Sequence, residues 1–129
     1  MGQDESVLGS CPIVAFVATR DAGRARTFYR DTLGLRLVSE DQFAVVFDAN
    51  GTTLRVSIVQ ELAPAKYTVL GWLVPDIVAS ARRLQLLGVE LERFGFMEQD
   101  EFGIWRAPGG ARVGWFKDPD GNVLSITQF

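Results

Sequence analysis

The chain has 129 residues, of which 47% are hydrophobic and 22% are charged, and its formal net charge is −3. This length suits one domain with a hydrophobic core, and an acidic balance without a dense Lys/Arg block argues against a nucleic-acid partner. The acidic N-terminal segment does not look like a signal peptide, and no apolar run is long enough to span a bilayer, so we expect no membrane association.

The single cysteine and the N-terminal segment suggest where the domain begins and where the protein resides. Cys11 has no second cysteine to pair with, which excludes an intrachain disulfide and fits a cytoplasmic location. Residues 1–10 are polar and are expected to form a flexible tail. We therefore predict a single domain over residues 11–129.

The first half of the chain predicts the element order β-α-β-β-β. An apolar, β-branched run predicts a strand over 13–18. Asp21 is a good N-cap for the helix that follows, and Gly34 is a good residue to end it. Further strands are expected over residues 35–39, 43–47 and 54–59, the last preceded by the turn Asp48-Ala-Asn-Gly51.

The second half predicts the same order with one addition. A strand over 69–74 leads to a helix that Asp76 caps and Gly88 ends. The remaining strands are expected over residues 89–93, 111–116 and 123–127. An insertion at 95–110 contains an acidic bend, a short strand over 103–106 and a Pro-Gly-Gly turn.

Short matching segments indicate that the two halves are copies of one another. Val14–Asp21 parallels Val69–Asp76, and Phe47–Val56 parallels Lys117–Ile126 with the turn glycines aligned. The modules span about 12–60 and 67–129. A duplicated unit of this kind can cover a shared, pseudo-symmetric cavity. The sequence thus predicts an α+β fold of tandem βαβββ modules.

Three motifs, in this order and with this internal repeat, connect the chain to a known superfamily. They are Asp21 with Phe28-Tyr29 and Leu33-Gly-Leu35, then Asp76 with Leu87-Gly-Val89, and finally Asp118-Pro-Asp-Gly-Asn122. The chain resembles the vicinal oxygen chelate superfamily, which includes glyoxalase I, bleomycin resistance proteins, fosfomycin resistance enzymes and extradiol dioxygenases. The resemblance implies a cupped mixed sheet with helices on its outer face and, as is usual in the superfamily, a homodimer.

The resemblance also implies four positions at which the superfamily's enzymes bind a divalent metal. Carried over by spacing, these positions are Val14, Arg55, Val69 and Ser125. Zn, Ni, Fe or Mn needs nitrogen or oxygen donors at about 2.0–2.2 Å, and the chain contains no histidine. Valine has no lone pair, and the cation of Arg55 would repel a metal. We therefore predict no metal site and no cofactor.

Strand alternation predicts what faces the cup in place of a metal. Phe16 shares a face with Val14, Ser57 with Arg55, and Thr127 with Ser125. Trp115 is expected to point into the cup, as the superfamily's pattern implies. An apolar, aromatic cavity with few polar groups suits a medium-sized organic ligand. The predicted ligand-binding residues are Val14, Phe16, Arg55, Ser57, Val69, Trp115, Ser125 and Thr127.

Arg55 is the main polar group of this predicted pocket and needs an anionic partner, because an unpaired buried charge is costly. The partner is either a ligand carboxylate or phosphate, or an internal carboxylate such as Asp100 or Glu101. A structural ion pair, or a side chain that reaches to solvent, is the competing interpretation. Trp105 packs the inserted hairpin, forms a lid or contacts a second subunit.

Two classes of function remain open, with a third in reserve. The first is a metal-independent protein that binds an aromatic or anionic organic ligand, like the bleomycin resistance proteins, which lack a metal site and sequester planar aromatic drugs between subunits. The second is an enzyme of lyase, isomerase or dioxygenase type with a metal-free or relocated site, which would need a carboxylate such as Asp100 or Glu101 over the cup. The third is a regulatory partner subunit. Ser125 has no histidine to activate it as a nucleophile.

Overall fold

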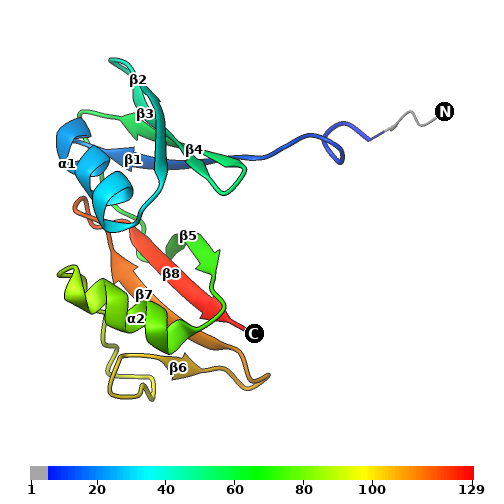
Figure 1. Cartoon of the computed structure of the whole chain (residues 1–129), viewed down its shortest axis with the longest axis vertical. Helices are drawn as coiled ribbons and strands as arrows, with labels where there is room; N and C mark the ends of the chain where they lie inside the picture. Colours follow the sequence, from blue (N-terminus) through cyan, green and yellow to red (C-terminus); the bar gives the residue numbers. More distant parts are fainter. Residues whose placement is uncertain (1–5) are drawn as a thin grey trace.

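The computed structural model of the protein describes residues 6–129, so half of the predicted 1–10 tail lies outside the described residues. Residues 6–13 form no helix or strand and extend away from the rest of the molecule (Figure 1). The first module contains β1 (Val14–Thr19), α1 (Ala22–Arg26), the π-helical η1 (Thr27–Thr32), β2 (Arg36–Glu40), β3 (Ala44–Ala49) and β4 (Thr52–Ile58). The second contains β5 (Thr68–Leu73), α2 (Ile77–Leu86), β6 (Trp105–Arg106), β7 (Arg112–Lys117) and β8 (Val123–Gln128).

Each module forms its own four-stranded mixed sheet. The strand order is β1-β4-β3-β2 in the first sheet and β5-β8-β7-β6 in the second. In both sheets the first and last strands of the module run parallel, and the other pairs are antiparallel. This repetition confirms the α+β class and the tandem βαβββ architecture, with the cup built from two sheets.

The helices begin and end where the sequence predicts. The side chains of Asp21 and Asp76 each accept a hydrogen bond from the backbone N–H three residues later, at 3.1 Å. Gly34 and Gly88 follow the helix ends with φ of 80° and 88°, the left-handed conformation that favours glycine. Among the helices of residues 6–129, none is long and apolar enough to cross a membrane.

The strand predicted over 89–93 is wrong. This segment is irregular, and the outer strand of the second sheet is β6, which comes later in the chain. Its one backbone bond to a neighbouring strand runs from Glu92 N–H to the carbonyl of Trp115 in β7, at 2.6 Å. The Gln99 side-chain amide bonds Glu92 C=O and the nearby backbone groups Phe94 N–H and Gly103 C=O. Leu91 is buried and lies where a side chain at Gly114 would be. The apolar pattern of residues 89–93 does not reveal that these contacts take the place of regular strand pairing.

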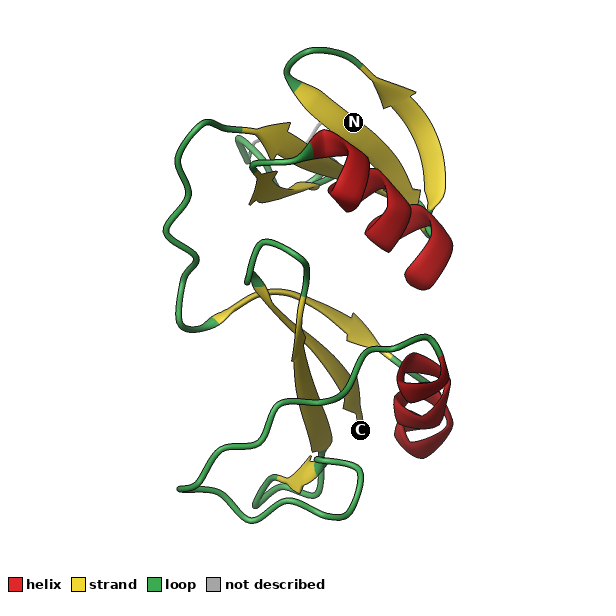
Figure 2. Ribbon diagram, turned by 90° about the vertical axis from the view of Figure 1, so that its left-hand side faces the viewer, coloured by secondary structure: helices red, strands yellow, loops and turns green. Residues whose placement is uncertain are grey.

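Each sheet is covered on one face and open on the other. Figure 2 shows α1 and α2 on the same side of the molecule, each against its own sheet. The core lies between helices and sheets and includes Tyr29, Phe47, Leu54, Ile77, Phe116 and Leu124, all nearly inaccessible to solvent. We call the opposite side of the two sheets the open face. Strand alternation places the predicted ligand-binding residues there.

The Asp118–Asn122 turn holds the two modules together. Asp118 is buried, and its Oδ2 accepts hydrogen bonds from Tyr29 Oη at 2.7 Å and Asn122 Nδ2 at 2.8 Å. Asp120 accepts from Thr19 Oγ1 and the backbone N–H of Arg20, and Asn122 Nδ2 donates to the carbonyl of Ala18. This turn of the second module thus bonds to the end of β1 and to helix η1 of the first module.

Candidate functional site

The open face carries large apolar side chains that a folded chain ordinarily buries. Phe16 is 58% exposed, Val14 48% and Val69 38%. Phe16, Ser57 and Val69 meet at the junction of the two modules, around a shallow hollow of about 310 Å³. The duplication therefore brings together predicted site residues that lie far apart in sequence.

Arg55 lies beside this hollow on β4, opposite Phe16 of β1 in the strand register. Its side chain is partly buried, and within residues 6–129 it makes no ion pair. No buried nitrogen of the described chain lacks a hydrogen-bond partner, so the guanidinium reaches solvent. Its charge also acts on Asp41. The N–H groups of Phe43 and Ala44 hold the pKa of Asp41 below its ordinary value, and the Arg55 charge lowers it slightly further.

The two carboxylates considered as partners for Arg55 serve the other module. Asp100 Oδ1 accepts hydrogen bonds from the backbone N–H groups of Phe102 and Ile104, both at 2.9 Å. The backbone carbonyls of Asp100 and Glu101 accept from Arg93. Both residues thus belong to the loop before β6, and within the described chain neither forms a salt bridge with Arg55.

On the second sheet, Ser125 and Thr127 occupy positions related to those of Arg55 and Ser57. Ser125 of β8 lies between Gly71 of β5 and Trp115 of β7 in the register. A Cβ atom at Gly71 would lie only 2.5 Å from Ser125 Oγ, so the glycine leaves room for this hydroxyl. Thr127 of β8 lies opposite Leu73 of β5 in the strand register.

A cluster of four aromatic rings extends the open face over the second module. The ring centroid of Trp115 lies 5.7 Å from that of Phe94, in an edge-on arrangement, and 6.0 Å from that of Trp105. The centroids of Phe94 and Phe96 are 5.8 Å apart. The Trp115 indole N–H donates to Thr68 Oγ1 at 3.0 Å, which fixes the ring. The neighbouring Phe116 instead packs in the core against Trp72. We call Phe94, Phe96, Trp105 and Trp115 the aromatic cluster.

Sequence reasoning found only part of this cluster. The resemblance to the superfamily predicts that Trp115 points into the cup, whereas nothing in the sequence predicts this for Phe94 and Phe96, because the loop that carries them has no period to follow. For Trp105 the sequence allows hairpin packing, a lid or a dimer contact, and the structure places its ring against Trp115, tilted by 36°. Its antiparallel pairing with Val113 is the signal that could have linked it to this face.

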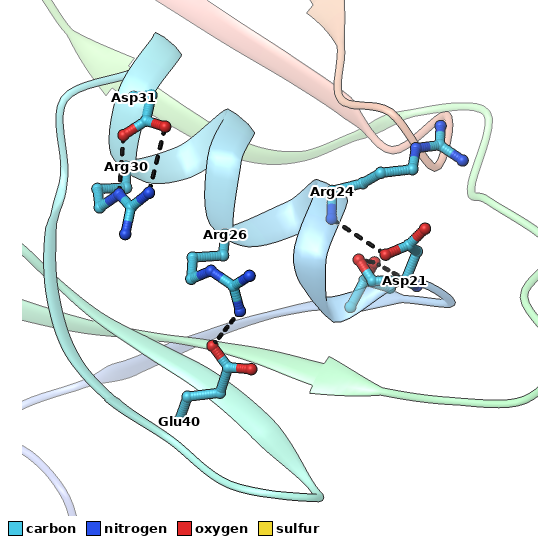
Figure 3. A network of polar contacts seen from close by, with 7 residues as sticks. Asp21, Arg24, Arg26, Arg30, Asp31 and Glu40 are labelled. Atoms are coloured by element: carbon cyan, nitrogen blue, oxygen red, sulfur yellow. Dashed lines mark hydrogen bonds and ion pairs between the residues drawn. The ribbon is translucent and has the colours of Figure 1, made fainter.

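The arginines of the first helix do not add an anion site. Figure 3 shows Arg26 paired with Glu40 at 2.7 Å and Arg30 with Asp31 at 2.7 Å. Arg24 donates to the carbonyl of Pro119 at 2.9 Å and so strengthens the contact between modules. Each of the three cations has a partner within the chain, in contrast to Arg55.

The four positions at which related enzymes hold a metal do not suit one here. They present two valines, a guanidinium and a hydroxyl, and a set with one weak oxygen donor cannot bind a transition metal tightly. Across residues 6–129, no three or more Cys, Asp or Glu side chains are grouped as a metal site would require. The donor chemistry therefore does not fit the metal of the superfamily's enzymes.

Comparison with known proteins agrees with this fold. Residues 12–126 match the model of the Glyoxalase/Bleomycin resistance protein/Dioxygenase superfamily, and the chain belongs to that superfamily. No curated protein matches the chain.

Three solved structures show the extent of the structural likeness. The lactoylglutathione lyase of Agrobacterium tumefaciens is 20% identical, with a TM-score of 0.72 over 92% of this chain and 93% of that one. The fosfomycin resistance protein FosX of Listeria monocytogenes is 13% identical, with a TM-score of 0.70 over 91% of each chain. A superfamily member from Sphaerobacter thermophilus is 25% identical, with a TM-score of 0.69 over 91% and 97%. Enzymes and resistance proteins thus share this fold.

Proposed function

We propose that the protein is a metal-independent small-molecule-binding member of its superfamily, and that it holds an aromatic or anionic organic ligand on the open face. The observation that carries this proposal is Arg55, a partly buried arginine that makes no salt bridge within residues 6–129 and whose charge acts only weakly on Asp41. A guanidinium offers two parallel N–H groups to a carboxylate or phosphate, so a ligand with such a group suits this position.

The remaining groups of the open face suit the organic part of such a ligand. Phe16 lies next to Arg55, and the aromatic cluster provides further ring surfaces on the second sheet. Aromatic rings contribute about 0.5–1.5 kcal/mol per ring pair beyond the area they bury. Ser57, Ser125 and Thr127 supply hydroxyls that orient a polar substituent. Val14 and Val69 complete the apolar floor.

We further propose that the ligand site is completed by a second copy of the chain in the cytoplasm. The support for a homodimer is the exposed apolar surface of the open face, since large exposed patches of this kind usually mark an interaction site. A net charge of −3 gives no support to a nucleic-acid partner.

The proposal is tested with 2-naphthoate and its neutral analogue 2-naphthamide. Replacement of Arg55 by Met keeps the apolar stem and removes the charge. We expect naphthoate affinity to fall by about 1.5 kcal/mol, because a charged hydrogen bond open to solvent lies at the low end of its range, while naphthamide affinity is unchanged. Calorimetry gives both affinities, and quenching of tryptophan fluorescence reports contact with the aromatic cluster.

The matched control is Arg36→Met, an exposed arginine of the same sheet whose nearest carboxylate is Asp48 at 3.7 Å. This control should leave both affinities unchanged. If Arg55→Met unfolds the protein while naphthoate still binds to the folded fraction with its original affinity, Arg55 is structural and the proposal is wrong.

A further inference from the structure

A second cavity lies on the opposite side of the molecule from the open face. It is a cleft of about 420 Å³ between the end of η1 and helix α2, with Trp72, Phe116 and Ile126 of the second sheet as its floor. Leu33 closes it from the first module, and Leu84 and Leu87 line it from α2. The volume is in the range of pockets that hold small organic molecules, about 300–1,000 Å³.

The internal repeat explains why the cleft exists. Phe28 and Tyr29 are the seventh and eighth residues after the cap Asp21, and both are buried. Tyr29 packs on Phe47 of the first sheet, and Phe28 lies toward the second module. The same positions after Asp76 are Arg83 and Leu84. A leucine and an outward guanidinium fill less space than two aromatic rings, so the second module leaves open the volume that the first one packs.

The polar side chains around the cleft include hydrogen-bond donors, and the one charged residue in its lining is positive. Arg83 is the one charged residue in its lining, and within residues 6–129 it forms no ion pair. Thr32, Ser80 and Trp72 also line it, and any of their side-chain polar atoms without a hydrogen-bond partner in the described chain is open to solvent. Asp31, the carboxylate adjacent to Thr32, is paired with Arg30.

We propose that this cleft binds a small amphipathic carboxylate, with the carboxylate at Arg83 and an apolar body over Trp72 and Phe116. Hydrogen-bond donors and a guanidinium at the mouth select an anion, and the leucine and aromatic walls select an apolar chain or ring. Because Thr32 and Leu33 come from the first module and α2 from the second, the ligand contacts both modules. This site is separate from the open face, and the variants Arg55→Met and Arg83→Gln distinguish binding at the two sites.

Octanoate, 1-octanol and octylammonium share a chain length and differ in charge, so they test the proposal by calorimetry. We expect saturable binding of octanoate in preference to octanol, and none of octylammonium. Arg83→Gln should weaken octanoate about fivefold, the upper end for a charge pair open to solvent, and leave octanol unchanged. Arg82→Gln is the matched control: Arg82 lies over the Phe102 ring at 5.2 Å, outside the cleft lining, and its replacement should have no effect.

Two further variants locate the ligand. Ala79 is an exposed helix residue that lines the cleft, and Ala79→Trp should fill it and abolish binding of both octanoate and octanol. Arg55→Met removes the anion-binding group proposed for the open face, and octanoate should still bind to the cleft of this variant, with the effect of Arg83→Gln retained. The proposal is overturned if octanoate does not bind saturably, if Arg83→Gln leaves its affinity intact, or if the Arg55→Met variant no longer binds it.

Discussion

The residues at the four positions carried over from the superfamily's metal ligands limit the chemistry that we propose for the open face. Arg55 and Ser125 occupy the late position in each module, and Val14 and Val69 the early one. A guanidinium at one late position replaces the charge of a metal ion with a fixed cation that the protein itself supplies. A ligand that a metal would have coordinated through its oxygens can then be held by hydrogen bonds instead.

This argument predicts the metal content of the protein. Elemental analysis of protein purified from its source should find no stoichiometric Zn, Ni, Fe or Mn, because the four positions offer no imidazole and no carboxylate. Finding about one transition metal per chain, lost when Ser125 is replaced by Ala, would contradict both this prediction and the metal-independent function.

Tyr29 is the residue whose ionisation the fold most strongly suppresses. Burial raises its pKa well above the ordinary value, and the adjacent Asp118 carboxylate raises it further. In the unfolded chain the pKa of a tyrosine is about 10, so above that pH the unfolded state loses a proton that the folded state keeps. The Tyr29 contribution to stability is therefore complete below about pH 10 and decreases as pH rises above it.

Absorbance titration checks this prediction in the variant Tyr67→Phe, which leaves Tyr29 as the sole tyrosine. Tyr67 is exposed, so its replacement should not disturb the fold. We expect the tyrosinate signal to appear only together with unfolding measured by circular dichroism. A tyrosinate signal near pH 10 from the folded protein would show that Tyr29 is accessible to solvent and that the Tyr29–Asp118 hydrogen bond is absent.

At the scale of elements, the two β-turns before the last strand of each module have diverged in role. Asp48 accepts one turn hydrogen bond, from Gly51 N–H at 3.1 Å. Its counterpart Asp118 accepts four, from Tyr29 Oη, Asn122 Nδ2 and the N–H groups of Asp120 and Asn122. Only the second turn joins the modules, and only its aspartate is buried.

The divergence predicts unequal effects of the same substitution. Asp118→Asn should lower the free energy of unfolding by about 3 kcal/mol, because an amide N–H₂ would then face groups that are themselves donors. Asp48→Asn, the matched control, should cost about 1 kcal/mol or less. Urea denaturation measures both values. Equal losses would mean that the Asp118 turn does not stabilise the contact between modules.

At the scale of the whole molecule, the helices and the Asp118 turn leave one side of both sheets uncovered. The exposed side chains there include Val14, Phe16, Val69 and Leu73. A second copy placed against this face would shelter them from water and deepen the shallow hollow at the module junction.

Sedimentation equilibrium should therefore give a mass twice the 14.2 kDa of one chain. Phe16→Lys should shift the equilibrium toward monomer, because it places a charge in an apolar interface. Leu86→Lys is the control: Leu86 is an exposed residue of α2, on the other side of the molecule, and its replacement should leave the mass unchanged. A stable monomer at micromolar concentration would argue against the dimer.

The local features of this protein could be predicted from its sequence, because they depend on near neighbours. The caps Asp21 and Asp76, the glycines that end the helices and the repeated βαβββ order are set by backbone preferences within a few residues. The absence of imidazole and carboxylate groups at the four superfamily positions is also read from residue identity alone, and the lack of a bound metal stays a prediction.

Tertiary structure decided what depends on groups distant in sequence. The segment 89–93 has the composition of a strand but is held by Gln99 and by the packing of Leu91 over Gly114, and neither contact leaves a periodic signal. Phe94 and Phe96 join Trp105 and Trp115 only because that irregular loop folds onto the open face. The cleft beside Arg83 likewise arises because Leu84 fills less of the helix–sheet interface than Tyr29 does in the other module, and such a difference in packed volume appears only when helix and sheet are assembled.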